Sequence, residues 1–441
     1  MRRSVLIPVM TSALLAAGLA HAADAGWHVE GVGATGQSYY DNIAVAGNDE
    51  GRRVVAWVNQ RRVYVALARP GRGFGAPRLV KLNEHEASFP RVVMNREGDA
   101  LVLWSYFDGK YRAGEFDREE DCCFGVRLAV LRHDGRLTRV QTLTPRGHDV
   151  YVGGYTIDGN GGIGVVWSEN EYYFAGRHGL FGRFSGPRGL RAEQKIDRSS
   201  IPLAVAFVHG RPRVLMSKWD RKGAGLFERW AERDWSFGHR RRVARGLDRG
   251  ADIAAATNER GDEVVAWWRD GYGRRPIRVG TRGPGDRLRI KTVDHAGRED
   301  SLSSFPAVAI APSGAAAVAW VKATKALRLV TTSGPGQRLR GPLTVATGGG
   351  LYSYYDLELG INARQESVLA WIEEDSGYRA TVTAAVVPPG GPSRRRVRLG
   401  TATDRIGLAP QGTAVMDGRG RATVVWRRYR AVNTASVVVP R

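Results

Sequence analysis

Short runs of apolar residues, each preceded by a polar turn, recur along the whole chain. In Asn258–Trp267, a turn that contains Asn258 and Gly261 leads into the apolar run Val264–Trp267. Asn and Gly supply the positive φ angles that a hairpin turn needs, and Val and Trp are strong strand formers. The pattern predicts a tight turn followed by a buried strand that ends in a large aromatic side chain.

The turn glycine and the aromatic residue are six positions apart, and this spacing defines an internal repeat of eight copies. In two copies the pattern deviates: Gly210 leads to Met216, with Trp219 three residues later, and Gln365 takes the glycine position before Trp371. Successive copies start about 47 to 63 residues apart, which is typical of four-stranded propeller blades. The regular copies are Gly51–Trp57, Gly98–Trp104, Gly161–Trp167, Gly261–Trp267, Gly314–Trp320 and Gly420–Trp426.

Each copy contains four segments typical of strands, separated by Gly, Pro and Ser. In the sixth copy these segments are Pro306–Ile310, Ala316–Trp320, Ala326–Thr331 and Leu339–Ala346. After the first 22 residues no stretch shows sustained helical periodicity, so we expect almost no helix. The sequence predicts an all-β fold, an eight-bladed β-propeller of four-stranded antiparallel blades. Seven blades are the alternative, because the copy around Gly210 is degenerate.

The last copy is one strand short. After Trp426 only one more strand fits, near Thr434–Val439, whereas Trp27–Val32 forms a strand-like segment before the first full copy. We therefore expect the N-terminal strand to complete the last blade and close the ring, which leaves no open sheet edge.

The first 22 residues read as a secretory signal peptide, so residues 23–441 form one propeller domain. Arg2 and Arg3 are the basic start, Val5–Leu19 is the apolar stretch, and Ala20–Ala22 matches a cleavage site. No later segment is long and apolar enough to span a bilayer. We expect an exported protein of the periplasm or the extracellular space, and a monomer.

The chain is strongly basic, with a formal net charge of +22. Such a charge favours anionic polymers as partners. Many of the Arg residues fall on predicted outer strands, however, and a solvated perimeter is the favoured interpretation of them. No nucleic-acid-binding motif is present, and we expect no nucleic-acid partner.

The two cysteines are adjacent, at Cys122 and Cys123, where a strained vicinal disulfide or two separate thiols are both open. They end a long insert, Ser105–Phe124, which also carries the acidic run Asp117–Asp121. This run lacks the offsets of an EF-hand. Ca²⁺ is a weak alternative there, and we expect no cofactor and no metal site.

Aromatic and acidic residues gather in the loops that precede the first strand or follow the second strand of each copy, and all these loops belong to one face of a propeller. Tyr and Trp platforms beside carboxylates suit sugars and extended peptides, although loop packing is an equal interpretation. The candidate ligand-binding residues are Tyr39, Tyr40, Asp41, Tyr106, Tyr172, Tyr173, Trp219, Asp252, Trp268, Asp270, Tyr354, Tyr355 and Asp356.

The repeat also places residues at the mouth of the central channel. Four positions before the turn, Arg91 and Glu358 stand among mostly small apolar residues. Ligand contact and a water-filled lining are both open for them. Six positions before the turn, Asn42, Asp252 and Asp356 are polar, against Phe89, Val152, Ile201 and Phe305.

The repeated phrase from Gly51 to Trp426 resembles the propeller repeats of exported bacterial proteins of unknown role. The resemblance covers nearly the whole chain after the leader and implies only the fold. Sialidase-type Asp boxes place the aromatic residue three positions after Gly rather than six, and WD40 and kelch signatures are absent. Quinoprotein alcohol dehydrogenases share eight blades and adjacent cysteines, but their Ala-x-Asp-x-x-x-Gly-x-x-x-Trp motif is missing here.

The sequence leaves two functions open. Neither a G-x-S-x-G elbow nor an H-E-x-x-H motif is present. The leading hypothesis is therefore an exported, non-enzymatic binding or scaffold propeller that recognises a glycan or an envelope protein on the Tyr/Trp/acid face. The alternative is a glycan-active hydrolase or lyase that uses carboxylates of the same face, such as Asp41, Asp252 or Asp356.

Overall fold

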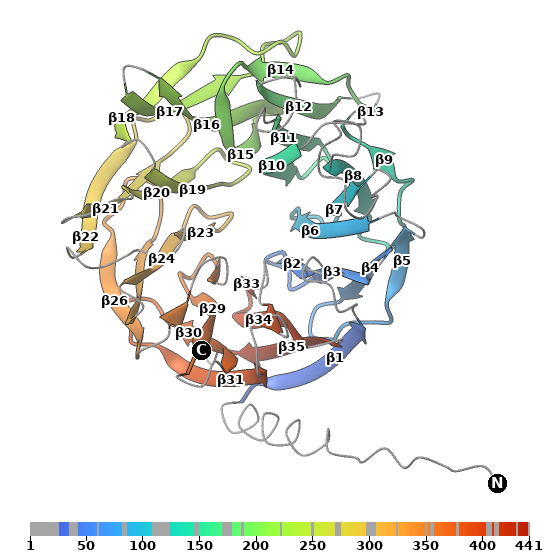
Figure 1. Ribbon diagram of the computed structural model, residues 1–441, viewed down its shortest axis with the longest axis vertical. Helices are drawn as coiled ribbons and strands as arrows, with labels where there is room; N and C mark the ends of the chain where they lie inside the picture. The colour runs from blue at the N-terminus through green and yellow to red at the C-terminus, as the bar shows by residue number, and fades with distance from the viewer. Residues whose placement is uncertain are drawn as a thin grey trace, which may run out of the picture.

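The computed structural model confirms an eight-bladed β-propeller (Figure 1). It describes residues 26–439 except 35–42, 60, 82–85, 108–123, 145–149, 170–178, 187–188, 221–222, 248–250, 270–274, 297–305, 323–324, 349–350, 353–356, 376–378, 403–407, 410–413 and 429–430. The predicted leader and the pair Cys122 and Cys123 lie outside this part of the chain. No helix long and apolar enough to cross a membrane occurs among the described residues.

Seven blades follow one another in chain order, and each runs from the ring axis outward (Figure 1). Blade 1 contains β2 (Ile43–Gly47), β3 (Arg53–Asn59), β4 (Arg62–Ala68) and β5 (Arg78–Lys81). Blade 2 contains β6 (Glu86–Met94), β7 (Ala100–Phe107), β8 (Phe124–Leu131) and β9 (Gln141–Thr142). Blade 3 contains β10 (Val150–Ile157), β11 (Ile163–Glu169), β12 (Gly179–Gly186), β13 (Gly189–Leu190) and β14 (Gln194–Asp197). Blade 4 contains β15 (Ser200–Val208), β16 (Arg211–Asp220), β17 (Gly223–Trp230) and β18 (Arg241–Leu247).

The second half of the ring repeats this order. Blade 5 contains β19 (Ala251–Thr257), β20 (Glu263–Arg269), β21 (Arg275–Arg282) and β22 (Arg289–Ala296). Blade 6 contains β23 (Ala307–Ile310), β24 (Ala316–Lys322), β25 (Ala326–Thr332) and β26 (Arg340–Thr347), each within two residues of its predicted bounds. Blade 7 contains β27 (Leu351–Tyr352), β28 (Glu358–Ile361), β29 (Ser367–Glu374), β30 (Ala380–Val387) and β31 (Arg394–Ala402).

Blade 8 joins the two ends of the chain, as predicted. It contains β32 (Leu408–Ala409), β33 (Ala414–Met416), β34 (Arg421–Arg428) and β35 (Ala431–Val438), and β1 (His28–Ala34) pairs with the outer edge of β35. The N-terminal strand therefore covers an edge that the C-terminal strand would otherwise leave unpaired (Figure 1).

The repeated aromatic residue packs between blades. In every blade it lies on the second strand, is at most 2% exposed, and belongs to the apolar cluster shared with the preceding blade. Met216 takes this place in blade 4. The described core thus consists of eight clusters, one at each junction between neighbouring blades.

The degenerate fourth copy forms a complete blade with a shorter turn. His209 and Gly210 have φ angles of 51° and 73°, and they connect the paired residues Val208 and Arg211. Two successive positive φ angles are typical of a two-residue type I′ hairpin. The copy deviates in sequence because Met216 replaces the repeated Trp, and its four strands still pair in the same order as in the other blades.

One detail of the predicted turn is wrong. Gly supplies the positive φ, as at Gly261 with 84°, but the turn Asn residues do not share it. The Asn258 side-chain oxygen instead accepts hydrogen bonds from the backbone N–H groups of Arg260 and Asp262. The Asn is favoured because its side chain closes the turn. The left-handed geometry falls on the Gly position, which Gln365 occupies in blade 7 with a φ of 63°.

Candidate functional site: the inner rim

Most of the predicted ligand-binding residues lie outside the described part of the chain. This applies to Tyr39, Tyr40, Asp41, Tyr172, Tyr173, Asp270, Tyr354, Tyr355 and Asp356. Two further candidates are placed by their backbone alone: Trp219 lies near the end of β16 and Asp252 near the start of β19. These two positions lie at the same end of neighbouring blades, because the start of an inner strand pairs with the end of the second strand.

Tyr106 and Trp268 are buried, and their side chains lie between blades. Tyr106 is 2% exposed in the cluster between blades 1 and 2, and Trp268 is 1% exposed in the cluster between blades 5 and 6. The guanidinium carbon of Arg127 lies 4.0 Å from the ring centroid of Tyr106. The sequence left a binding platform and packing both open at these positions, and both rings are packed between blades.

Exposed apolar side chains do occur on the described face, at the starts of three successive inner strands. Phe89 on β6 is 38% exposed, Tyr151 on β10 is 56% exposed, and Ile201 on β15 is 41% exposed. Tyr151 and Ile201 occupy equivalent positions, opposite Ser168 and Ser217, and Phe89 lies one position further along its own strand. Exposed apolar side chains that gather near one end of neighbouring blades mark a candidate interaction surface. Together with Arg91 they form a set that we call the inner rim.

Contacts connect the members of the inner rim across blades. The guanidinium carbon of Arg91 lies 5.8 Å from the ring centroid of Tyr151, and Arg91 donates a hydrogen bond to the carbonyl of Val152. Blades 3 and 4 approach closely, since a Cβ added at Gly153 would come within 2.2 Å of the Pro202 carbonyl oxygen. A cation held against an aromatic ring leaves the opposite ring face for a ligand.

Each of the three strands has a register irregularity at the rim. The irregularities fall between Ser88 and Arg91, between Val152 and Gly154, and between Pro202 and Ala204. The inner strands β2 and β19 pair without such a shift. A bulge adds a residue and re-aims the side chains beside it. The bulge in blade 2 makes Phe89 an extra, unpaired residue, whereas Tyr151 and Ile201 lie just before the bulges of their strands and pair with Ser168 and Ser217.

Charged residues from two different blades affect the pKa of one tyrosine near the rim. Burial raises the pKa of Tyr155 on β10, the positive charge of Arg91 lowers it, and the carboxylate of Glu358 on β28 raises it again. A cation from blade 2 and an anion from blade 7 thus act on one phenol. Sequence spacing had picked out Arg91 and Glu358 as unusual, and the structure brings both into the surroundings of Tyr155.

Among the described residues, no group of three His, Cys, Asp or Glu side chains is placed to hold a metal ion. The acidic run Asp117–Asp121 lies outside these residues. The described rim offers aromatic and aliphatic surface, a guanidinium and a phenol. This chemistry suits stacking and hydrogen bonding with a ligand.

Comparisons with protein-family models and with curated proteins give no match. Among solved structures, a puromycin hydrolase mutant is 16% identical with a TM-score of 0.48, over 88% of this chain and 59% of the hydrolase. An ulvan lyase from a new polysaccharide lyase family is 11% identical with a TM-score of 0.45, over 84% of this chain and 97% of the lyase. A protein of unknown function from Dyadobacter fermentans is 10% identical with a TM-score of 0.38, over 93% of this chain and 99% of that protein.

These likenesses carry no argument about ligand or activity, because identities and TM-scores are low. Propellers also host many unrelated functions. The class of protein is defined by the eight sheets themselves, and the function must be argued from the residues of this chain.

Proposed function

We propose that this chain is an exported, non-enzymatic binding propeller that recognises a glycan, or a protein of the cell envelope, at the inner rim. The observation that supports it is the exposure of Phe89, Tyr151 and Ile201 on one end of three successive blades. Sugar rings stack on aromatic faces, and a protein partner would bury the same apolar side chains. The predicted leader supports export.

The test is a glycan array, followed by isothermal titration of any bound glycan with the mature protein. The double variant Phe89→Ala with Tyr151→Ala should weaken binding at least tenfold, because it removes both exposed rings. Leu79→Ala with Ile290→Ala is the matched control, since these side chains are 43% and 42% exposed on other strands. The control should change the affinity less than twofold.

Salt dependence separates the rim from the overall charge. Binding at the rim should persist at high salt, whereas attraction to the basic perimeter is screened. Equal losses in both double variants would contradict the proposed site. Turnover of the bound glycan would contradict the non-enzymatic reading and favour the hydrolase or lyase. If no glycan binds, envelope proteins are pulled down with the wild type and with the same two double variants. The rim variant should then capture less of a protein partner than the control variant.

A further inference from the structure

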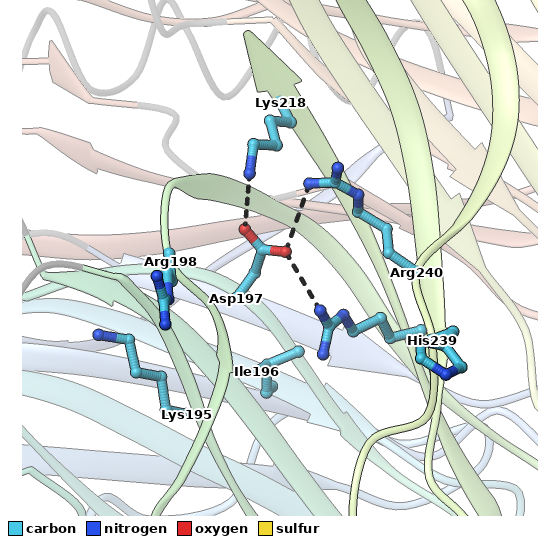
Figure 2. Close-up of a pocket in the computed structure, with 8 residues that line it drawn as sticks. Lys195, Ile196, Asp197, Arg198, Lys218, His239 and Arg240 are labelled. Atoms are coloured by element: carbon cyan, nitrogen blue, oxygen red, sulfur yellow. Dashed lines mark hydrogen bonds and ion pairs between the residues drawn. The ribbon is translucent and has the colours of Figure 1, made fainter. Parts of the chain in front are cut away.

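A basic pocket lies at the junction of blades 3 and 4, away from the ring axis. Figure 2 shows its side chains around Asp197. The cavity measures about 610 Å³ and is lined by Lys195, Ile196, Asp197, Arg198, Lys218, Arg229, His239 and Arg240. Asp197 ends β14 of blade 3, and Lys218 and Arg229 belong to β16 and β17 of blade 4. Five cations face a single carboxylate, which leaves an excess of four positive charges.

Asp197 organises the cations without neutralising them. Its carboxylate lies 3.4 Å from the Lys218 ammonium, 3.6 Å from the Arg229 guanidinium and 3.5 Å from the Arg240 guanidinium. These separations exceed the roughly 2.7–2.9 Å of tight charge-assisted hydrogen bonds. The three cationic side chains also remain 17%, 25% and 28% exposed, whereas Asp197 is 4% exposed. Each cation therefore keeps donors that point elsewhere.

The carboxylate is itself firmly held. Burial raises the pKa of Asp197, but hydrogen bonds from the Ser199 backbone N–H and the Ser200 hydroxyl, together with Lys218 and Arg240, outweigh it and keep the pKa low. Asp197 is consequently a fixed anion at neutral pH. It anchors the inner wall of the pocket.

Packing fixes further cations of the lining. The Arg240 guanidinium carbon lies 4.5 Å from the ring centroid of Phe227, and the Lys195 ammonium lies 5.5 Å from that of Phe181. The Nε atom of Arg229 is buried without a hydrogen-bond partner among the described residues. Lys195 and Arg198 stand on the other side of the pocket from Arg240 (Figure 2). Cations thus converge from both sides on one space.

We propose that this pocket binds a phosphate or sulfate group carried on a saccharide. Guanidinium and ammonium groups are the usual partners of such oxyanions. Phosphate and sulfate groups both offer three terminal oxygens to several donors at once, where a carboxylate offers two, and a phosphate monoester also carries up to two negative charges. The cavity is larger than one oxyanion needs and falls within the range of small-molecule sites. The inference that a saccharide carries the oxyanion depends on the proposed glycan recognition. The inference of an oxyanion site depends only on the pocket itself.

The experiment is isothermal titration of the folded mature chain with glucose 6-phosphate, glucose 6-sulfate, inorganic phosphate, glucuronate and glucose. We expect saturable binding of glucose 6-phosphate, at least tenfold tighter than glucuronate, and no binding of glucose. The double variant Lys195→Gln with Arg198→Gln should weaken it at least fivefold. Both residues are exposed, and neither is part of the core, so the variant should fold.

The matched control is Arg338→Gln with Arg340→Gln, which removes two exposed positive charges far from the pocket in sequence and on blade 6. It should change affinity less than twofold. Equal weakening by both variants, or no saturable binding of any phosphate or sulfate probe, would overturn the proposal. Binding of inorganic phosphate as tight as that of glucose 6-phosphate would retain the oxyanion site and overturn the saccharide carrier. Binding to phosphatidic acid vesicles alone would overturn the saccharide carrier in favour of a membrane.

The outcome is separable from that at the inner rim. Phe89→Ala with Tyr151→Ala leaves the basic pocket intact, because neither residue lines it. That variant should keep its affinity for glucose 6-phosphate even if it loses a neutral glycan.

Discussion

At the scale of single residues, the turn asparagines connect neighbouring blades. The Asn95 side chain accepts from the Asp99 backbone N–H at 2.8 Å and donates to the Asp158 carbonyl of blade 3 at 2.7 Å. Asn48 and Asn362 make the equivalent donation to the turn of the next blade. The repeated Asn thus closes its own turn and ties that turn to the following one.

We predict that Asn95→Ala destabilises the fold by about 1–3 kcal/mol, because it leaves buried backbone groups without partners. The measurement is urea-induced unfolding of both proteins. Asn433→Ala serves as the control, since the Asn433 side chain donates an exposed, local hydrogen bond to the carbonyl of Ala431. If Asn95→Ala were as stable as Asn433→Ala, the link between turns would contribute nothing.

A second residue-scale prediction concerns pH. The pKa of Asp197 is lower in the folded protein, so its ionised carboxylate stabilises the fold above the ordinary carboxyl pKa, and this contribution disappears as pH falls through the folded pKa. Asp197→Asn should therefore be less stable than the wild type at pH 7. The difference should shrink below about pH 4.

Thermal unfolding at a series of pH values measures this difference. Asp286→Asn removes an exposed carboxylate, and its stability should follow that of the wild type. A gap between Asp197→Asn and the wild type that stayed constant down to pH 2 would show that protonation of Asp197 is not involved.

At the scale of elements, a buried ion network joins the strands of blades 4 and 5. Arg282 on β21 lies 2.7 Å from Glu228 on β17 and 2.9 Å from Glu263 on β20. Arg213 on β16 lies 3.3 Å from Glu263. Burial raises the pKa of Glu228, but Arg282 and its neighbouring arginines outweigh burial and lower it. These buried charges are stabilised by one another, because their burial removes them from water.

We predict that Glu263→Gln destabilises the protein by about 3–5 kcal/mol, since it leaves two buried guanidinium groups with too little negative charge. Urea-induced unfolding monitored by tryptophan fluorescence provides the measurement. Glu97→Gln breaks the exposed pair of Glu97 with Arg96 and should show no measurable loss. Equal stability of the two variants would contradict a desolvated network.

At the scale of the whole molecule, the ring is closed by two chain ends. Strand β1 pairs with β35, and the Arg53 side chain of blade 1 donates to the Thr423 hydroxyl of blade 8 at 2.9 Å. Burial, assisted by the charge of Arg421, lowers the pKa of Arg53 to about 10. Apolar residues of β1, blade 1 and blade 8 share one cluster. Closure therefore combines pairing, a buried hydrogen bond and packing.

We predict that a chain beginning at residue 35, which lacks β1, unfolds at a temperature lower by about 5 °C or more than one beginning at residue 26. It should also associate as concentration rises, because the edge of β35 becomes free to pair. Calorimetry and sedimentation velocity measure the two effects. Identical behaviour of the two chains would mean that β1 is dispensable for closure.

Much of the architecture could be predicted from short, local sequence patterns. The six-residue spacing from the turn position to a large apolar residue, which is Met216 in blade 4 and Trp elsewhere, identified the second strand of each blade. The single strand left after Trp426 indicated how the ring closes. The spacing is local and recurs in every copy, so each copy adds support to the same fold. The candidate site was harder to predict from sequence. A Tyr at a strand end gives the same sequence pattern whether its ring faces a ligand or packs against a neighbouring blade, as Tyr106 does.

The sequence by itself determined the propeller repeat and the positions of the interblade aromatics, because period-2 strands and glycine turns act within a few residues. It favoured eight blades and left seven open, and the structure decided for eight. Only the tertiary structure decided that Phe89, Tyr151 and Ile201 are exposed near the same end of three successive blades. It also decided that Asp197 of blade 3 meets cations of blade 4. The exposure of the rim side chains and the approach of cations to Asp197 both depend on how neighbouring blades pack. The sequence pattern within one blade does not contain that information.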